Sequence, residues 1–190
     1  MSPAELPPAT AVTTAILAGA VSAITLLATA CSPSPSHADA DVAPTATVLR
    51  VVDGDTVDVV DDSRGRLRIR VIGIDSPEVH KPGYSIGCWG PQASDFARTA
   101  LTGQRVAIVT DPSQDAHDRY GRTLAYLDRP GGWDFSVEAA RAGAARVYVY
   151  GHKPAARTPQ IEAAESEARQ AGRGMWGPPC NGHTESVPVN

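Results

Sequence analysis

Residues 66–74 read RLRIRVIGI, and this stretch decides the fold of the chain. Apolar residues and arginines alternate along it, so that one face carries Leu67, Ile69 and Val71 and the other carries Arg66, Arg68 and Arg70. Strict alternation is typical of a strand with one buried face, and here the outer face is basic. Gly73, near the end of the stretch, indicates a bulge or a close approach of another part of the backbone.

Four more runs rich in β-branched and apolar residues predict further short strands, at residues 48–52, 57–60, 105–110 and 122–127. The first two runs flank Asp53-Gly54-Asp55, and an Asp-Gly pair between such runs is a hairpin signal. The sequence therefore predicts five strands, each of them short.

Three other segments have helical spacing, at residues 91–101, 134–142 and 158–171. Gly143 and Gly172 follow the last two, as helix-ending glycines do. Thr158 and Pro159 are predicted as the N-cap and the first residue of the third helix, which we expect to be mostly solvated. Five short strands with three helices fit an α+β, mainly β, fold: a five-stranded OB-fold barrel. A generic α+β sheet is the alternative.

The first 31 residues have the composition of an export segment. Residues 11–30 are almost entirely apolar or small and lead into Cys31, which resembles a bacterial lipoprotein signal with Cys31 as the lipidated residue. A transmembrane anchor or a cleaved secretory signal is the alternative, because the run is long enough to span a bilayer. All three readings predict a domain outside the cytoplasm, as a membrane-anchored lipoprotein or a secreted protein.

Composition divides the rest of the chain into three parts. Residues 32–45 are rich in Pro, Ser, Ala and Asp and predict a disordered linker, residues 46–180 form the domain, and residues 181–190 are expected to be a loose tail. The domain carries seventeen Lys and Arg and seventeen Asp and Glu, so it is neutral. Any binding of nucleic acid must therefore come from local placement of arginines rather than from net charge.

Two cysteines remain once Cys31 is set aside. An even pair in an exported protein predicts a disulfide, here between Cys88 and Cys180. No spacing of Cys and His in the sequence is typical of a zinc site.

Five charged residues near strand ends and turns have the chemistry of metal-assisted phosphodiester cleavage. Asp55 and Asp75 offer hard oxygen ligands for an ion such as Ca²⁺. Arg70 and Arg122 offer planar donors for a phosphate that gains charge in the transition state, and Glu78 offers a base for an attacking water. Each motif alone is explained by turn chemistry. Together, at positions that a scaffold can present at one rim, they favour an active site.

The three motifs that hold these residues, 52–56, 70–78 and 118–122, resemble those of the thermonuclease family, typified by staphylococcal nuclease. The resemblance runs from about Val48 to Trp176 and includes residues 90–94, 143–150 and 174–176. It implies an OB-fold barrel with three helices, a requirement for Ca²⁺, and cleavage of DNA and RNA to products with a 3′-phosphate.

The resemblance also assigns roles to individual residues. It makes Asp55, Asp75 and the backbone carbonyl of Ser76 the Ca²⁺ ligands, with Asp53 as a supporting acid. It makes Arg70 and Arg122 the phosphate-binding residues, Glu78 the residue that orients or deprotonates water, and Tyr120, Tyr148 and Tyr150 the contacts of the nucleotide. Residues 79–89 differ from the family: the staphylococcal loop is rich in Lys, whereas this one has a single Lys and gains Cys88. We therefore expect weaker binding of long polynucleotides.

These observations predict a monomeric, Ca²⁺-dependent, extracytoplasmic nuclease that hydrolyses DNA and RNA with little sequence preference. One alternative is a catalytically inactive module of the same fold that binds nucleic acid or protein at the cell envelope. A purely structural Ca²⁺ site is another, but it has no need of two phosphate-binding arginines. Because the chain has every acid and arginine of the motifs, the enzyme is favoured.

Overall fold

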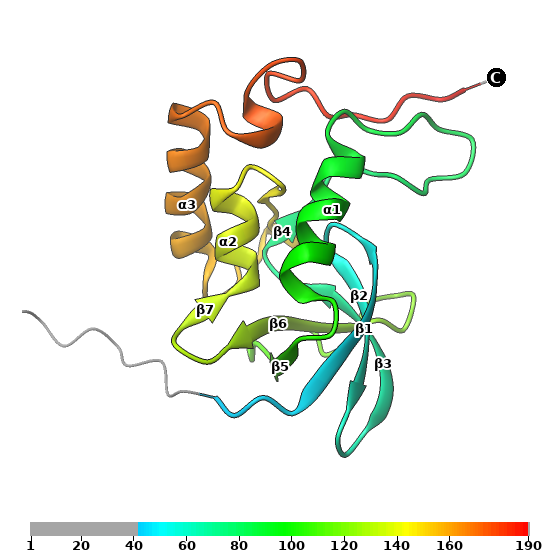
Figure 1. Ribbon diagram of the computed structural model, residues 1–190, viewed down its shortest axis with the longest axis vertical. Helices are drawn as coiled ribbons and strands as arrows, with labels where there is room; N and C mark the ends of the chain where they lie inside the picture. Colours follow the sequence, from blue (N-terminus) through cyan, green and yellow to red (C-terminus); the bar gives the residue numbers. More distant parts are fainter. Residues whose placement is uncertain (1–41, 190) are drawn as a thin grey trace, which may run out of the picture. The chain divides into compact units, whose positions relative to one another are not determined.

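A computed structural model describes residues 42–189 of the chain (Figure 1). The predicted export segment, Cys31 and almost all of the predicted linker lie outside the described residues. Within residues 42–189, no helix has the length and apolar character that crossing a bilayer requires.

Five strands form the barrel: β1 (Ala46–Asp53), β2 (Thr56–Asp61), β3 (Gly65–Val71), β5 (Arg105–Val109) and β6 (Thr123–Arg129). Antiparallel pairs join β3 to β2, β2 to β1, β1 to β5 and β5 to β6. A parallel pairing of β3 with β6 joins the two ends of this order and closes the barrel. The predicted five-stranded OB fold is confirmed. The short strand β7 (Trp133–Asp134) extends this sheet by pairing with β6, whereas β4 (Ile74–Asp75) and β8 (Arg146–Val147) form a separate two-stranded sheet.

The three predicted helices are present as α1 (Gly90–Leu101), α2 (Phe135–Arg141) and α3 (Thr158–Gln170), with short 3-10 turns at η1 (Tyr150–His152) and η2 (Gly174–Trp176). Asp134 caps α2, because its carboxylate accepts hydrogen bonds from the N–H groups of Ser136 at 2.7 Å and Val137 at 3.3 Å. Figure 1 shows α2 beside α3 on one side of the barrel.

One expectation for α3 is wrong. Thr158 is the first residue of the helix rather than its N-cap, which is Arg157, and no side chain caps this end. The helix is mostly solvated, as expected, but Glu165 is buried and accepts a hydrogen bond from the Val147 N–H at 2.6 Å. This contact joins α3 to β8.

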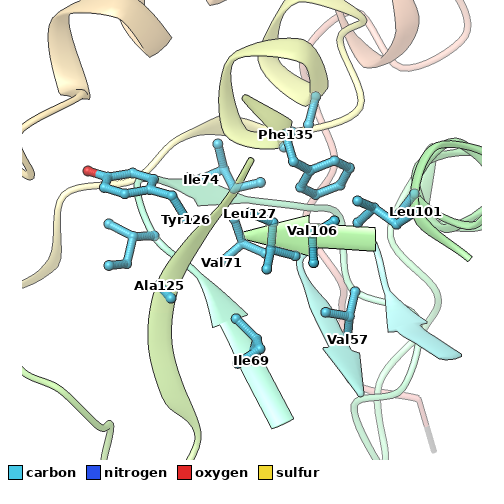
Figure 2. Packing of buried hydrophobic residues seen from close by; sticks show 14 of the residues in the cluster. Val57, Ile69, Val71, Ile74, Leu101, Val106, Ala125, Tyr126, Leu127 and Phe135 are labelled. Carbon is cyan, nitrogen blue, oxygen red and sulfur yellow. The ribbon is translucent and has the colours of Figure 1, made fainter. Parts of the chain in front are cut away.

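The core fills the barrel and the space beneath the helices (Figure 2). The alternation predicted for β3 holds, since Ile69 and Val71 are fully buried, and they pack with residues of the other strands and of α1 and α2, including Val57, Leu127, Leu101 and Phe135. Burying one such side chain contributes about 1.5–3 kcal/mol. The barrel is therefore a rigid support for the loops at its rim.

Gly73 sets the direction in which the chain leaves β3. The predicted strand 66–74 is interrupted at Ile72-Gly73, where Gly73 adopts φ +81°, and β4 begins after this turn. This positive φ favours glycine, and a Cβ atom here would also lie 2.5 Å from Cδ1 of Ile161. The turn places Asp75 just beyond Arg70.

The C-terminal residues are not the loose tail that composition suggests. Ser85 donates its N–H to the Val187 carbonyl at 2.7 Å, and Val189 donates to the Gly83 carbonyl at 2.9 Å. Figure 1 shows the red C-terminal chain beside the green loop that precedes α1. Cys88 and Cys180 form a disulfide, with their Cα atoms 5.8 Å apart. Backbone pairing, which needs no apolar side chains, orders this segment.

Candidate active site

The turn between β1 and β2 brings Asp55 against the segment that follows β4. Asp55 Oδ2 accepts hydrogen bonds from the Ser76 N–H at 2.8 Å and the Ser76 hydroxyl at 3.1 Å. A Cβ atom at Gly54 would lie 2.6 Å from the Ser76 Cβ, so only glycine lets the turn approach this closely. Thr56 donates its hydroxyl to Asp55 Oδ1 at 3.0 Å. The Asp-Gly-Asp-Thr motif thus holds Asp55 in one orientation.

Arg70 lies between the two acids that the sequence predicts as metal ligands. Its Nε atom lies 3.2 Å from Asp55 Oδ1, and its Nη2 atom donates to Asp75 Oδ1 at 3.0 Å. Its Nη1 atom donates to the carbonyl oxygens of Val71 at 2.7 Å and Ile74 at 2.8 Å. The Arg70 side chain is only 12% exposed, whereas Arg68 on the same strand face is exposed and pairs with Asp58. Arg70 therefore lies with these two acids and not on the basic outer surface.

Negative charge is crowded at this point. Burial, with a further contribution from the Asp55 charge, raises the pKa of Asp53 to about 6. Burial and the Asp55 charge also raise the pKa of Asp75, against the opposing effect of Arg70. Each carboxylate makes ionisation of its neighbour less favourable, and a nearby cation stabilises the ionised forms.

Two of these acids carry oxygens of the kind that a Ca²⁺ ion binds. The Asp55 and Asp75 carboxylates converge on one cationic group, Arg70, and both carry the hard oxygens that Ca²⁺ takes. Within residues 42–189, no group of three or more His, Cys, Asp and Glu side chains converges as a metal site. Ser76 contacts Asp55 through its N–H and hydroxyl, and the ligand role of its carbonyl stays a prediction.

Arg122 is held by a residue that the sequence reading missed. Asp118 Oδ2 accepts a hydrogen bond from Arg122 Nε at 2.6 Å, and Asp118 Oδ1 accepts from the N–H groups of Tyr120 at 2.9 Å and Arg122 at 3.0 Å. Gly121, at φ +76°, closes this turn. An Asp at the start of a tight turn is typical of an Asx-turn, so the role of Asp118 in this turn could have been predicted from the sequence. The Arg122 Nη1 atom points toward Thr56, at 3.4 Å from its hydroxyl.

The arginines and Asp75 line a cavity of about 610 Å³ whose other lining residues include Tyr120, Tyr148 and Tyr150. The ring of Tyr148 lies 5.8 Å from the Arg70 Cζ atom, and the ring of Tyr120 lies 5.5 Å from the Arg122 Cζ atom. The rings of Tyr148 and Tyr150 are 6.5 Å apart. Cations beside exposed aromatic rings suit a ligand with a phosphate and a flat base. Lys153, Gln114 and His117 also line this cavity and were not predicted.

Glu78 lies apart from this cavity lining. Its side chain is exposed, and its Oε1 atom accepts hydrogen bonds from the N–H groups of Val79 at 3.0 Å and His80 at 2.8 Å. Its charge still adds to the rise in the pKa of Asp75, so the two carboxylates are electrostatic neighbours. The structure thus gathers Asp55, Asp75, Arg70 and Arg122 at one rim, with Glu78 beside them and turned onto its own loop.

Comparisons with a family model and with known proteins point to the same family. Residues 68–178 match the family described as Staphylococcal nuclease homologue. The chain is 38% identical over 133 residues to a thermonuclease of Staphylococcus hyicus, covering 70% of this chain and 75% of that protein. It is 39% identical over 129 residues to a thermonuclease of Staphylococcus intermedius, covering 68% and 74%. It is 37% identical over 129 residues to an Escherichia coli O157:H7 protein described as an uncharacterized endonuclease, again covering 68% and 74%.

The barrel, the acid and arginine cluster and these relatives together define a nuclease, a hydrolase that acts on nucleic acid. The chain belongs to the staphylococcal nuclease family.

Proposed function

We propose that this chain is a Ca²⁺-dependent nuclease that hydrolyses phosphodiester bonds of both DNA and RNA with little sequence preference. The observation that supports it most strongly is the position of Arg70, which contacts both Asp55 and Asp75 beside a cavity with tyrosine walls. Stacking on tyrosine accepts any base, because every base has a flat face. This favours recognition of the nucleic-acid backbone over recognition of sequence. The products are expected to carry a 3′-phosphate, as the resemblance implies.

In this proposal Asp55, Asp75 and the Ser76 carbonyl hold the Ca²⁺ ion, and Asp53 supports them. When bound, the ion supplies Lewis-acid stabilisation of a phosphoryl oxygen and favours ionisation of a bound water. Arg70 and Arg122 bind the scissile phosphate through guanidinium N–H groups. Their Nε atoms are already held by Asp55 and Asp118, so both are oriented before substrate binds. Each preoriented donor of this kind contributes about 2.7–4 kcal/mol to lowering the barrier.

Glu78 is proposed to orient the attacking water or to take its proton. Its carboxylate now accepts hydrogen bonds from Val79 and His80, so it must leave these N–H groups to reach a water. The side chain is exposed, and rotation about its own bonds needs no movement of the core. Glu78 is therefore the one proposed catalytic group whose side chain has to move.

We further propose that the protein acts outside the cytoplasm and is attached to the membrane through Cys31. The disulfide between Cys88 and Cys180 supports the location outside the cytoplasm, because such bonds persist in oxidising compartments. The apolar run that ends at Cys31 supports it independently. Cell fractionation of the wild-type chain and a Cys31→Ser variant tests this part. Membrane association that needs Cys31 is expected, and a wild-type protein found in the cytoplasm with Met1 intact would contradict it.

The experiment for the catalytic part is cleavage of double-stranded DNA, single-stranded DNA and RNA by the purified protein and by an Asp75→Asn variant. The variant should lose activity on all three substrates, because it replaces a carboxylate that is proposed to bind Ca²⁺ and that pairs with Arg70. Asp95→Asn, an exposed acid on α1 that pairs with Arg98, is the matched control and should retain full activity. Equal activity of Asp75→Asn and Asp95→Asn would overturn the site assignment.

A further inference from the structure

The C-terminal segment, residues 180–189, is held against the loop of residues 79–89 that follows Glu78. The disulfide joins its first residue to Cys88. Val187 donates its N–H to the Ser85 hydroxyl at 3.0 Å and accepts from the Ser85 N–H at 2.7 Å. The two segments are thus joined at both ends of their contact.

The same segment is anchored to the body of the domain on its other side. Arg146 of β8 donates to the Gly182 carbonyl at 3.2 Å and to the Thr184 hydroxyl. Thr184 is buried, and the Gly182 N–H donates to the Met175 carbonyl at 2.7 Å. These contacts fix the segment independently of the loop that it touches.

Gly87 connects the segment to Glu78. The Gly87 N–H donates to the Glu78 carbonyl at 2.8 Å. A Cβ atom at Gly87 would lie 2.6 Å from the Thr184 carbonyl oxygen, 3.1 Å from the Glu78 N atom and 3.2 Å from its carbonyl oxygen. Gly87 is therefore enclosed between the C-terminal segment and the backbone of Glu78.

We propose that the C-terminal segment is a positioning element for Glu78, and that it acts through Gly87. The inference rests on the catalytic role proposed for Glu78. The Glu78 carboxylate binds N–H groups of its own neighbours, so its location follows the loop backbone. The segment holds that backbone in place from Thr184 to Gly87. A nuclease whose loop is held in this way keeps its water-orienting residue beside Asp75 in the absence of substrate.

The test compares Val187→Pro with Val187→Thr. Proline removes the N–H that binds Ser85, whereas threonine keeps it, and the Val187 side chain is exposed, so neither change opens a cavity. Val187→Pro should lower kcat about ten- to a hundredfold through misplacement of Glu78, with KM and the Ca²⁺ midpoint unchanged. Val187→Thr should keep wild-type kcat. Gly87→Ala, which meets the Thr184 carbonyl directly, should reproduce the loss.

A double-mutant cycle distinguishes positioning from general destabilisation. In a Glu78→Gln background Val187→Pro should cause no further loss of kcat, because both changes act on one group. The proposal is overturned by wild-type kcat in Val187→Pro, by losses that multiply in the double variant, or by a change confined to KM or the Ca²⁺ midpoint.

Amide hydrogen exchange gives a readout that does not need activity. Faster exchange at Gly87 and at residues 79–80 in Val187→Pro than in Val187→Thr would support the link between the C-terminal segment and the Glu78 loop. This result would hold even if the wild-type protein cleaved no nucleic acid, and such inactivity would refute only the proposed function. Equal exchange in the two variants overturns the link.

Discussion

The Arg70 Nε atom lies 3.2 Å from Asp55 Oδ1, and both side chains are largely buried, at 12% and 8% exposure. The guanidinium is further held by Asp75 and by two backbone carbonyls. A group fixed at so many points does not reorganise when charge develops on a substrate, which is the condition for electrostatic catalysis. The alternating stretch 66–74 therefore contributes both the barrel wall and, through its last arginine, the site.

Arg70→Lys should lower the rate of DNA cleavage about a hundredfold or more, because one ammonium cannot hold two carboxylates and two carbonyls while binding phosphate. Arg68→Lys is the matched control, since the exposed Arg68 lies two residues earlier on the same face and pairs with Asp58, away from the site. Initial rates on one DNA substrate measure both. Comparable losses in the two variants would contradict the role of Arg70.

Asp118→Asn should lower kcat about ten- to a hundredfold, because a charge-assisted hydrogen bond of about 1.5–3 kcal/mol no longer orients the Arg122 guanidinium. In an Arg122→Ala background the same change should have little further effect, since its target is gone. Steady-state kinetics of the two single variants and the double variant check this. Full additivity would show that Asp118 acts elsewhere.

Replacing both Cys88 and Cys180 by serine should lower the melting temperature by about 10 °C or more. The bond joins residues 92 apart, and a loop of that size corresponds to about 4–5 kcal/mol of lost chain entropy in the unfolded state. A dithiol reductant should shift the wild type in the same direction and leave the double variant unchanged. Equal melting of wild type and variant in oxidising buffer would be inconsistent with this account.

Asp111 should make the domain sensitive to acid. Burial alone would raise the pKa of its carboxyl, but hydrogen bonds from the Ala156 N–H, from Ser113 and from the Tyr126 hydroxyl outweigh burial and hold the pKa below its usual range. A depressed pKa in the folded state means that the stabilisation is present above the unfolded value of about 3.9 and is lost as pH falls through the folded value.

The free energy of unfolding from urea titrations, measured between about pH 5 and pH 2, should therefore fall less steeply for Asp111→Asn than for the wild type. Asp111→Asn will be less stable at neutral pH, so the comparison concerns the slope and not the absolute value. Asp95→Asn, on the exposed face of α1, should parallel the wild type. If the free energy of unfolding changed with pH at the same slope in Asp111→Asn and the wild type, Asp111 would not contribute to acid sensitivity.

The sequence predicts the elements whose signals are local. Alternation in residues 66–71, the Asp-Gly turn after β1 and the glycines after α2 and α3 each depend on neighbouring residues, and each forms as expected. The five-stranded OB fold and the three helices follow from these signals and from the family resemblance.

Contacts between distant segments could not be predicted in the same way. The pairing of Val187 with Ser85 depends on backbone groups, which every sequence has, so composition alone suggested a loose tail. Alternation placed Arg70 on the outer face with Arg68, but the turn at Gly73 brings Asp75 over it and buries it. The orientation of Glu78 toward its own loop likewise depends on the fold around it.

The most direct measurement of the central claim is the initial rate of DNA cleavage by the purified protein, first in EGTA and then as free Ca²⁺ is raised. We predict no cleavage in EGTA and a saturable recovery with a midpoint at about 10⁻⁴–10⁻³ M, the range of extracellular Ca²⁺ sites, as expected for a site with few carboxylates. Mg²⁺ at the same concentrations should not restore comparable turnover, because it demands octahedral geometry and dehydrates reluctantly. Cleavage in EGTA as fast as in Ca²⁺ would contradict the assignment of Asp55 and Asp75 as metal ligands.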